Sequence, residues 1–410
     1  MVAGSSGPVV PPWRVVLSSN AWRSLLAAAI LSSFGDYLAR MALAILVFRR
    51  TGSPILTSLT FAVTYLPYLV GAGAFASLGD RFPRKSVMVW SDLFRAVMAS
   101  ALAVPGIPIW LALVVFTLLG VAEPPFDAAR AALAPELNDA NAYRTGHAIM
   151  QTALAAVSGI GVAAAGVVVG LGGISLAFVV DGLTFVASAG FASRGIRERR
   201  NTSGPLPHTR RRDVVGLAWR NPQLRRLILL AAGGAACAVV PDGLAVVVSH
   251  QAGYGSVTAG LLALAPFAGA TVGTTIVIAG IAPARRAGHM IPLAVLTFVP
   301  LALCAADPGI YITGALWFAA GVGTSYQVLA NQEYVLATPV EHRGELFGVA
   351  AACVLGASGV GVLAGGILAE HMSGTRAVGV AGLIGLLIAG LLSARAPEPT
   401  RRPAPVGGSA

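Results

Sequence analysis

The sequence predicts an all-α membrane protein in which twelve transmembrane helices form two six-helix bundles. Of its 410 residues, 56% are hydrophobic and only 11% are charged, whereas roughly 25% of the residues in soluble domains are charged. The mean hydropathy is +0.77, and long apolar runs recur along the whole chain. These runs are continuous rather than alternating, which favours spanning helices over membrane β-strands.

A helix needs about 20 apolar residues to cross a bilayer, and twelve stretches of this kind follow one another. We expect the spans at 22–48, 55–78, 86–104, 107–130, 145–170, 173–193, 225–248, 256–281, 289–306, 309–336, 346–368 and 376–395.

One connection, 194–224, is much longer than the others and is rich in arginine and proline. It separates six spans from six. We therefore expect a first bundle over 1–193, a cytoplasmic basic linker over 194–224, and a second bundle with a short polar tail over 225–410.

The distribution of cations predicts the orientation. The net charge of +11 could indicate nucleic-acid binding, but most of the 28 Lys and Arg residues fall at the termini and in every second connection. This is the positive-inside bias of membrane proteins. We expect a multi-pass protein of the inner (cytoplasmic) membrane with both termini in the cytoplasm, in contact with membrane lipid and not with nucleic acid. Arg49, Arg50 and Arg376 fall on the opposite side, against the rule.

Neither a metal site nor a cofactor is expected. Cys237, Cys304 and Cys353 lie within apolar spans without CxxC or histidine spacing, so we interpret them as packing residues. The chain has no nucleotide-binding G-x-x-x-x-G-K-[ST] motif and neither H-E-x-x-H nor G-x-S-x-G. These observations argue against an enzyme.

Two glycine-rich stretches indicate an internal repeat. Residues 158–166 read Ser-Gly-Ile-Gly-Val-Ala-Ala-Ala-Gly, and residues 358–366 read Ser-Gly-Val-Gly-Val-Leu-Ala-Gly-Gly. They lie in the fifth and eleventh spans, so duplication would give two halves of the same orientation. Chance similarity of small-residue runs is the alternative. Such glycines let helices approach closely, for static packing or for movement.

Ionisable residues within spans are the first candidate functional residues, because each costs about 2.5–3.5 kcal/mol on insertion scales. Asp36 and Arg40 are spaced i,i+4 in the first span and face the same side of a helix. They form either a structural pair or a site where Asp36 takes a proton or faces a cationic substrate.

The fourth span contains Glu123, Asp127 and Arg130 on one helix face, next to two prolines that would bend it. Glu123 has no cation within one turn and suits proton coupling. Asp127 and Arg130 are closer to the cytoplasmic end and suit a structural or gating pair.

Further candidates lie in the seventh and tenth spans. Asp242 follows a proline in the seventh, and Glu333 lies in the cytoplasmic third of the tenth, where it could also mark the membrane boundary. Tyr326 and Gln327 of the tenth span are candidate substrate contacts, although tyrosine is equally common in packing.

A charged loop follows the second span and contains Asp80, Arg81, Arg84 and Lys85. The third span has Asp92 and Arg95 at i,i+3, one to two turns from the cytoplasm, where they could reach this loop.

The loop resembles a family signature. Residues 76–85 read Ala-Ser-Leu-Gly-Asp-Arg-Phe-Pro-Arg-Lys, similar to the major facilitator superfamily pattern Gly-x-Leu-Ala-Asp-Arg-x-Gly-Arg-Lys, with departures at Ala76 and Pro83. Other stretches resemble the superfamily's drug, macrolide and siderophore exporters, the branch that includes the enterobactin exporter; they are 35–36, 51–54, 91–96, 128–137 and 177–185. The chain departs from proton-coupled exporters at Phe116, where many have arginine, and at Val162, where proline is usual.

The resemblance implies that the first, fourth, seventh and tenth spans line a central cavity, and each of them carries an acid here. It implies that Asp80 latches the loop to charged partners and a helix N-terminus across the two halves, and that Asp181 is peripheral and structural. It also implies a monomer.

Together these observations predict a secondary transporter that exports an amphipathic small molecule in exchange for protons. A facilitator or importer is the alternative within transport. A non-transporting receptor or scaffold is the alternative outside it.

Overall fold

The structure is a computed structural model, and it describes residues 16–65, 67–68, 82–137, 140–196, 211–281, 286–339 and 342–394. Within these ranges the regular structure is helical, and they contain no strand. Asp80 and Arg81 of the charged loop lie outside the described residues.

The helices of the first part of the chain are α2 (Asn20–Thr51), α3 (Pro54–Ala62), α6 (Arg84–Leu102), α7 (Ile109–Val121), α8 (Glu123–Leu133) and α9 (Ala140–Gly195). Those of the second part are α10 (Arg211–Arg220), α11 (Pro222–Ala238), α12 (Val240–Gln251), α13 (Ser256–Gly280), α14 (Arg286–Leu303), α15 (Ile310–Gly323), α16 (Tyr326–Ala337), α17 (Arg343–His371) and α18 (Gly374–Ala394). Short 3-10 turns η1 (Val63–Tyr65), η2 (Ala134–Glu136) and η4 (Cys304–Ala306) extend α3, α8 and α14.

Each of the twelve predicted spans overlaps at least one of these helices. Eight helical stretches among the described residues are long and apolar enough to cross a membrane. One of them, α9, contains two predicted spans. Between these spans Gly173 adopts φ 80° and breaks the helix. A φ in this region is accessible to glycine and strained for other residues, so the predicted turn after residue 170 has a local cause.

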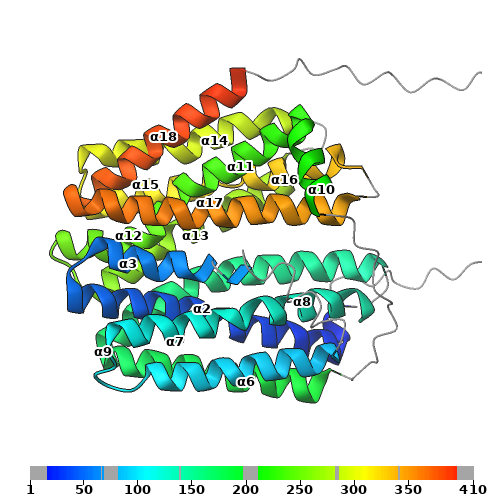
Figure 1. Ribbon diagram of the computed structural model, residues 1–410, viewed down its shortest axis with the longest axis vertical. Coiled ribbons are helices and arrows are strands. Elements are labelled where there is room, and N and C mark those ends of the chain that lie inside the picture. Colours follow the sequence, from blue (N-terminus) through cyan, green and yellow to red (C-terminus); the bar gives the residue numbers. More distant parts are fainter. Residues whose placement is uncertain are drawn as a thin grey trace, which may run out of the picture.

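The helices lie in two groups (Figure 1). Helices α2 to α9 form the lower group, and α10 to α18 form the upper group. The axes of most helices are roughly aligned with one another, irrespective of chain direction. We call the end where α6 begins the Arg84 end and the end where α2 gives way to α3 the Gly52 end. Both groups have connections at both ends, as expected for antiparallel spans.

Among the spans in the described ranges, three are interrupted near their middle. The fourth breaks at Ala122 between α7 and α8, and the seventh breaks at Val239 between α11 and α12. In both, proline occupies the first positions of the second helix, where its missing N–H costs little. The tenth span breaks at Thr324 and Ser325, between α15 and α16. These breaks place Glu123 and Asp242 in the first turn of α8 and α12.

The two glycine-rich stretches make equivalent contacts. A Cβ on Gly161 would collide with the α2 backbone, and one on Gly361 would collide with the α11 backbone. A Cβ on Gly166 would collide with α13, and one on Gly366 would collide with Ser58 on α3. Each stretch therefore packs against the first predicted span of its own half, in α2 or α11, and against one helix of the other group, as duplication predicts.

The linker contains structure that the sequence analysis does not predict. Within 194–224, residues 211–220 form helix α10. Ala218 is buried and Leu217 packs beside it in the main hydrophobic core. The apolar side of this otherwise basic helix thus docks on α11 and α17.

Candidate functional site

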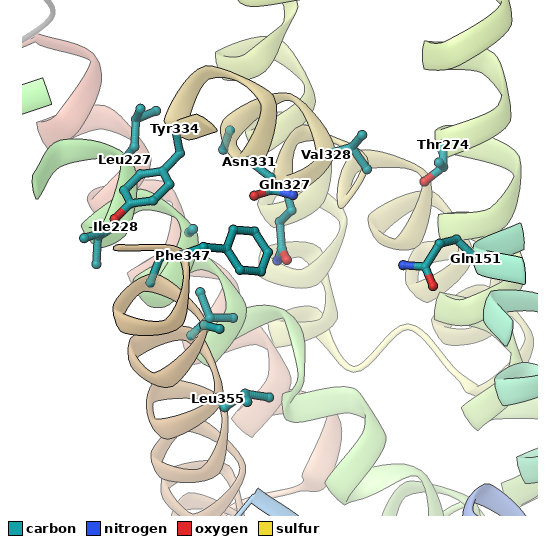
Figure 2. Close-up of a pocket in the computed structure, with 15 residues that line it drawn as sticks. Gln151, Leu227, Ile228, Thr274, Gln327, Val328, Asn331, Tyr334, Phe347 and Leu355 are labelled. Atoms are coloured by element: carbon teal, nitrogen blue, oxygen red, sulfur yellow. The ribbon is translucent and has the colours of Figure 1, made fainter. Parts of the chain in front are cut away.

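A cavity of about 590 Å³ lies between helices of the two groups. Figure 2 shows its walls, with α11, α16 and α17 on one side and α9 and α13 on the other. Its lining residues are Gln151, Leu227, Ile228, Ala231, Thr274, Gln327, Val328, Ala330, Asn331, Tyr334, Phe347, Ala350, Ala351, Val354 and Leu355. Most lie on the segments of these helices toward the Arg84 end. The walls are apolar apart from three amides, a hydroxyl and a phenol, which suits an amphipathic ligand.

A second cavity of about 220 Å³ adjoins the first, since Gln327 and Val354 line both. Asp242 is one of its walls, together with Phe267 of α13 and Thr324 from the break in the tenth span. The interruptions of the seventh and tenth spans therefore meet at this smaller cavity. Discontinuous helices form substrate and ion sites in many secondary transporters.

Arg40 of α2 interacts both with Asp242 of the smaller cavity and with acids of the first group of helices. Its guanidinium lies 4.9 Å from the centre of the Tyr37 ring, and Tyr37 packs edge-on against Phe267 at 5.5 Å. Glu123 and Asp242 both lie close enough to Arg40 to interact with it electrostatically. We call Arg40, Glu123 and Asp242 the central charge group. It joins α2, α8 and α12, which are parts of the first, fourth and seventh spans.

Asp36 has a different partner from the one that its spacing predicts. Its hydrogen bonds go to Arg95 of α6, whose Nη1 donates to both carboxylate oxygens of Asp36, at 2.9 and 3.1 Å. Arg40 interacts with Asp36 electrostatically, without a hydrogen bond or salt bridge between them. Arg95 also donates to Asp92 at 2.6 Å, and Asp92 accepts from Ser188 of α9 at 2.5 Å. The α2 side chain at position 36 thus turns toward α6 and away from its neighbour one turn along.

We call Asp36, Asp92 and Arg95 the sealed cluster. Arg95 and Asp92 have no exposed surface, and the Arg95 guanidinium lies between the rings of Phe126 and Phe185, at 4.9 and 4.6 Å. No member of this cluster lines either of the two cavities above. Nor do Asp92 and Arg95 pair with the described part of the charged loop, Arg84 and Lys85. The arrangement favours a structural role for these three residues.

The remaining candidates of the first group lie nearer the Arg84 end. Arg130 pairs with Asp127 at 2.8 Å, which confirms the expected pair, and Tyr68 donates to the other oxygen of Asp127 at 2.9 Å. Arg84 donates to the carbonyl of Ala132 at 3.0 Å and so ties the start of α6 to α8.

In the tenth span, Gln327 lines both cavities, whereas Tyr326 is fully buried against Gly234 and Phe298. Tyr326 therefore belongs to packing. Glu333 is half-buried and lines neither cavity.

Several wall residues were not among the predicted site residues. Gln151, Thr274, Asn331 and Phe347 are ordinary helix residues, and their chemistry alone does not distinguish them. The signal for Gln151 is a primary amide in an apolar span, and Asn331 lies one turn after Gln327.

Comparisons with known proteins agree with the fold. Residues 25–332 match the family model of the Major Facilitator Superfamily. Macrolide efflux protein A of Streptococcus pyogenes is 26% identical over 129 residues, and the match spans 28% of this chain and 32% of that protein's length. The chain thus covers about a third of the length of the curated relatives that it matches.

Solved structures share the architecture. A POT family transporter in complex with 5-aminolevulinic acid has a TM-score of 0.70 at 10% identity, over 91% of this chain and 95% of its own. A bacterial homologue of the iron transporter ferroportin, in an inward-facing state, has a TM-score of 0.66 at 15% identity, over 92% and 99%. Identities this low are evidence for the fold alone. With the family match across three quarters of its length, this multi-pass membrane protein belongs to the major facilitator superfamily of transporters.

Proposed function

We propose that this transporter resides in the cell membrane with both termini in the cytoplasm and exports an amphipathic small molecule in exchange for protons. In this proposal the bundles over 1–193 and 225–410 rock about the cavity and expose it to each side in turn. The observation that carries the proposal is the link between the large cavity and an acid within a span: Gln327 lines the cavity of about 590 Å³ and also the smaller one that Asp242 lines.

The cavity supports a small amphipathic substrate. Its volume is within the range of pockets for drug-sized ligands, about 300–1,000 Å³. Its carbon-rich walls suit an apolar skeleton, while Gln151, Gln327 and Asn331 offer amide donors and acceptors at separate points. Neither an acid nor a base lines this larger cavity, so the charged groups that could carry protons lie beside it rather than in it.

The central charge group supports proton coupling. Glu123 and Asp242 are the first-turn acids of two broken helices and share one cation, Arg40. A proton on either acid would change the charge balance around Arg40 where helices of the two bundles meet. Uptake of a proton can thereby favour one arrangement of the bundles over the other.

The packing at the Gly52 end supports alternating access. Glu370 of α17 accepts hydrogen bonds from Ser53 at 2.5 Å and from the Ile55 N–H of α3 at 3.2 Å. Phe48 of α2 packs edge-on against His250 of α12 at 5.2 Å. These contacts join the two groups at the end opposite the large cavity. If the basic Arg84 end faces the cytoplasm, this is an inward-facing arrangement.

The relative named above is a macrolide efflux protein. Macrolides are therefore the first compounds to test, within a wider set of amphipathic molecules.

The test is transport in proteoliposomes. Purified protein is reconstituted and given a panel of macrolides and other amphipathic compounds, with and without an imposed pH gradient. We expect movement of at least one compound that depends on the gradient, and its loss in Glu123→Gln and Asp242→Asn. Asp307→Asn is the matched control, because it makes the same acid-to-amide change outside both cavities. Asp307 has φ 56°, a backbone region that asparagine tolerates.

The other outcomes assign the alternatives. Flux without dependence on the pH gradient would identify a facilitator, and accumulation in the opposite direction would identify an importer. Saturable binding without flux would identify a receptor.

A further inference from the structure

The two arginines that violate the positive-inside rule lie in a cavity of their own. Arg49 and Arg50 end α2 at the Gly52 end, and both are exposed. They line a cavity of about 310 Å³ with parts of α6, of the connection between α6 and α7, and of α9. The other lining residues are Leu46, Leu102, Val104, Pro105, Gly106, Ile107, Ile174 and Ser175. None of them is acidic.

The cations are only partly engaged by the protein. Arg50 donates to the carbonyl oxygen of Ile107, which holds its side chain against the connection between α6 and α7. Arg49 has no hydrogen-bond or ion-pair partner within the described residues. Each guanidinium has five N–H donors, so most of the N–H groups of these two arginines are available to a ligand.

The part of the cavity wall that α9 contributes also favours an anion. Gly173 breaks α9, so Ile174 and Ser175 begin a new helical segment that continues to Gly195. The first N–H groups of a helix lack partners within it, and they carry the positive end of the helix dipole. Ile174 and Ser175 of this helix start line the same cavity as Arg49 and Arg50, a combination suited to phosphate.

The remaining walls are apolar. Leu46, Leu102 and Ile107 are buried and present carbon surface to the cavity. Trp110, in the first turn of α7, is 67% exposed, and tryptophan is enriched where a membrane meets water. Carbon chains attached to a phosphate in this cavity would meet apolar side chains.

From this geometry we propose that the cavity binds a phosphate oxyanion, with Arg49, Arg50 and the start of the second α9 segment as its donors. The apolar walls favour an anionic lipid headgroup as the source, and inorganic phosphate offers the same chemistry. The site lies at the opposite end from the substrate cavity. Phosphate binding would explain why two arginines are found at this end, where the positive-inside rule does not favour them.

The test uses native mass spectrometry of the purified full chain in neutral detergent. Delipidated protein is titrated with phosphatidylglycerol and with phosphatidylcholine of the same chains. We expect phosphatidylglycerol to bind about tenfold more tightly, because its phosphate is not neutralised by a choline cation. The preference should be lost in the double variant Arg49→Gln with Arg50→Gln. It should persist in Arg376→Gln, which removes a third cation of this end outside the cavity.

The single variant Arg49→Gln keeps the Arg50 contact to Ile107 and covers the case in which the double variant does not fold. Equal affinity for the two lipids, or a full preference in a folded Arg49→Gln variant, would overturn the proposal. Competition by inorganic phosphate that needs the same arginines would support the site and assign a soluble source. Arginine-dependent lipid binding that excess phosphate leaves unchanged would support the site and assign the lipid source.

Discussion

The sealed cluster and the central charge group begin one helical turn apart on α2, yet their surroundings differ. Asp36 forms a buried ion pair with Arg95, whose guanidinium lies between two phenylalanine rings. Arg40 lies near Glu123 and near Asp242, a wall of the smaller cavity. Both groups combine two acids with one arginine, and Asp36 also interacts electrostatically with Arg40 and Glu123. The contact of one member, Asp242, with a cavity distinguishes the group suited to proton exchange from the group suited to structure.

The comparison also shows why local spacing misleads for buried charges. An i,i+4 pair on an exposed helix contributes about 0.2–0.5 kcal/mol, so a better partner elsewhere easily replaces it. Arg95 offers Asp36 two hydrogen bonds at 2.9 and 3.1 Å from a neighbouring helix. In a buried site, these charge-assisted hydrogen bonds are worth more than an electrostatic neighbour on the same helix.

The largest effect is expected for Arg95→Gln. It would leave Asp36 and Asp92 buried without their cation, and breaking a buried ion pair by removing one partner costs about 3–5 kcal/mol. We expect little or no folded protein in detergent, measured by size-exclusion yield and by thermal unfolding.

Neutralising all three residues, as Arg95→Gln with Asp36→Asn and Asp92→Asn, should recover much of the yield. A stable Arg95→Gln single variant with normal transport would remove the structural role from the sealed cluster.

The second prediction concerns the central charge group. We expect Glu123→Gln and Asp242→Asn to fold normally, because each replaces an acid by an amide of the same shape. Transport driven by a pH gradient should fall to the level of empty liposomes, since neither amide can carry a proton. The measurement is gradient-driven flux per folded molecule. Gradient-driven flux at the unsubstituted rate in both variants would show that the coupling proton travels elsewhere.

Much of the fold could be predicted from the sequence, because lipid imposes length and hydropathy on every span. Two of the three mid-span breaks have visible causes, Pro124 with Pro125 and Pro241. The third, at Thr324 and Ser325, has no proline and emerges only in the structure. Helix α10 is missed because its ten residues contain three arginines and an aspartate, so they do not form an apolar run.

The candidate site could be predicted only in part. Hydropathy finds Asp36, Glu123 and Asp242, since a carboxylate in an apolar span is unusual. It cannot find their partners, because Asp36 and Arg95 are 59 residues apart in the chain. Nor can it separate wall residues from packing residues: Gln327 lines the cavities and its neighbour Tyr326 does not.

The third prediction moves to an acid outside both groups. Glu370 links α17 to the start of α3 at the Gly52 end, where it is exposed. Glu370→Gln keeps the shape and removes the charge from a helix N-terminus, a loss of about 0.5–1 kcal/mol. We expect the balance between the two open states to shift about two- to fivefold away from the arrangement seen here. Distance measurements between spin labels on α3 and α17 would report it.

A matched acid-to-amide change at Asp307 should leave those distances unchanged. An unchanged distribution in Glu370→Gln as well would mean that its contacts do not contribute to closing this end.

The smallest effect is expected for Asp127→Asn, which tests the comparison within one helix. Asp127 follows Glu123 by one turn of α8, but its side chain is 39% exposed and is held by Arg130 and Tyr68. A partly exposed pair of this kind contributes about 0.2–1 kcal/mol. We therefore expect a small loss of thermal stability and nearly unchanged gradient-driven flux, in contrast to Glu123→Gln. If Asp127→Asn abolished coupling while Glu123→Gln did not, the proton site would lie nearer the Arg84 end than the central charge group does.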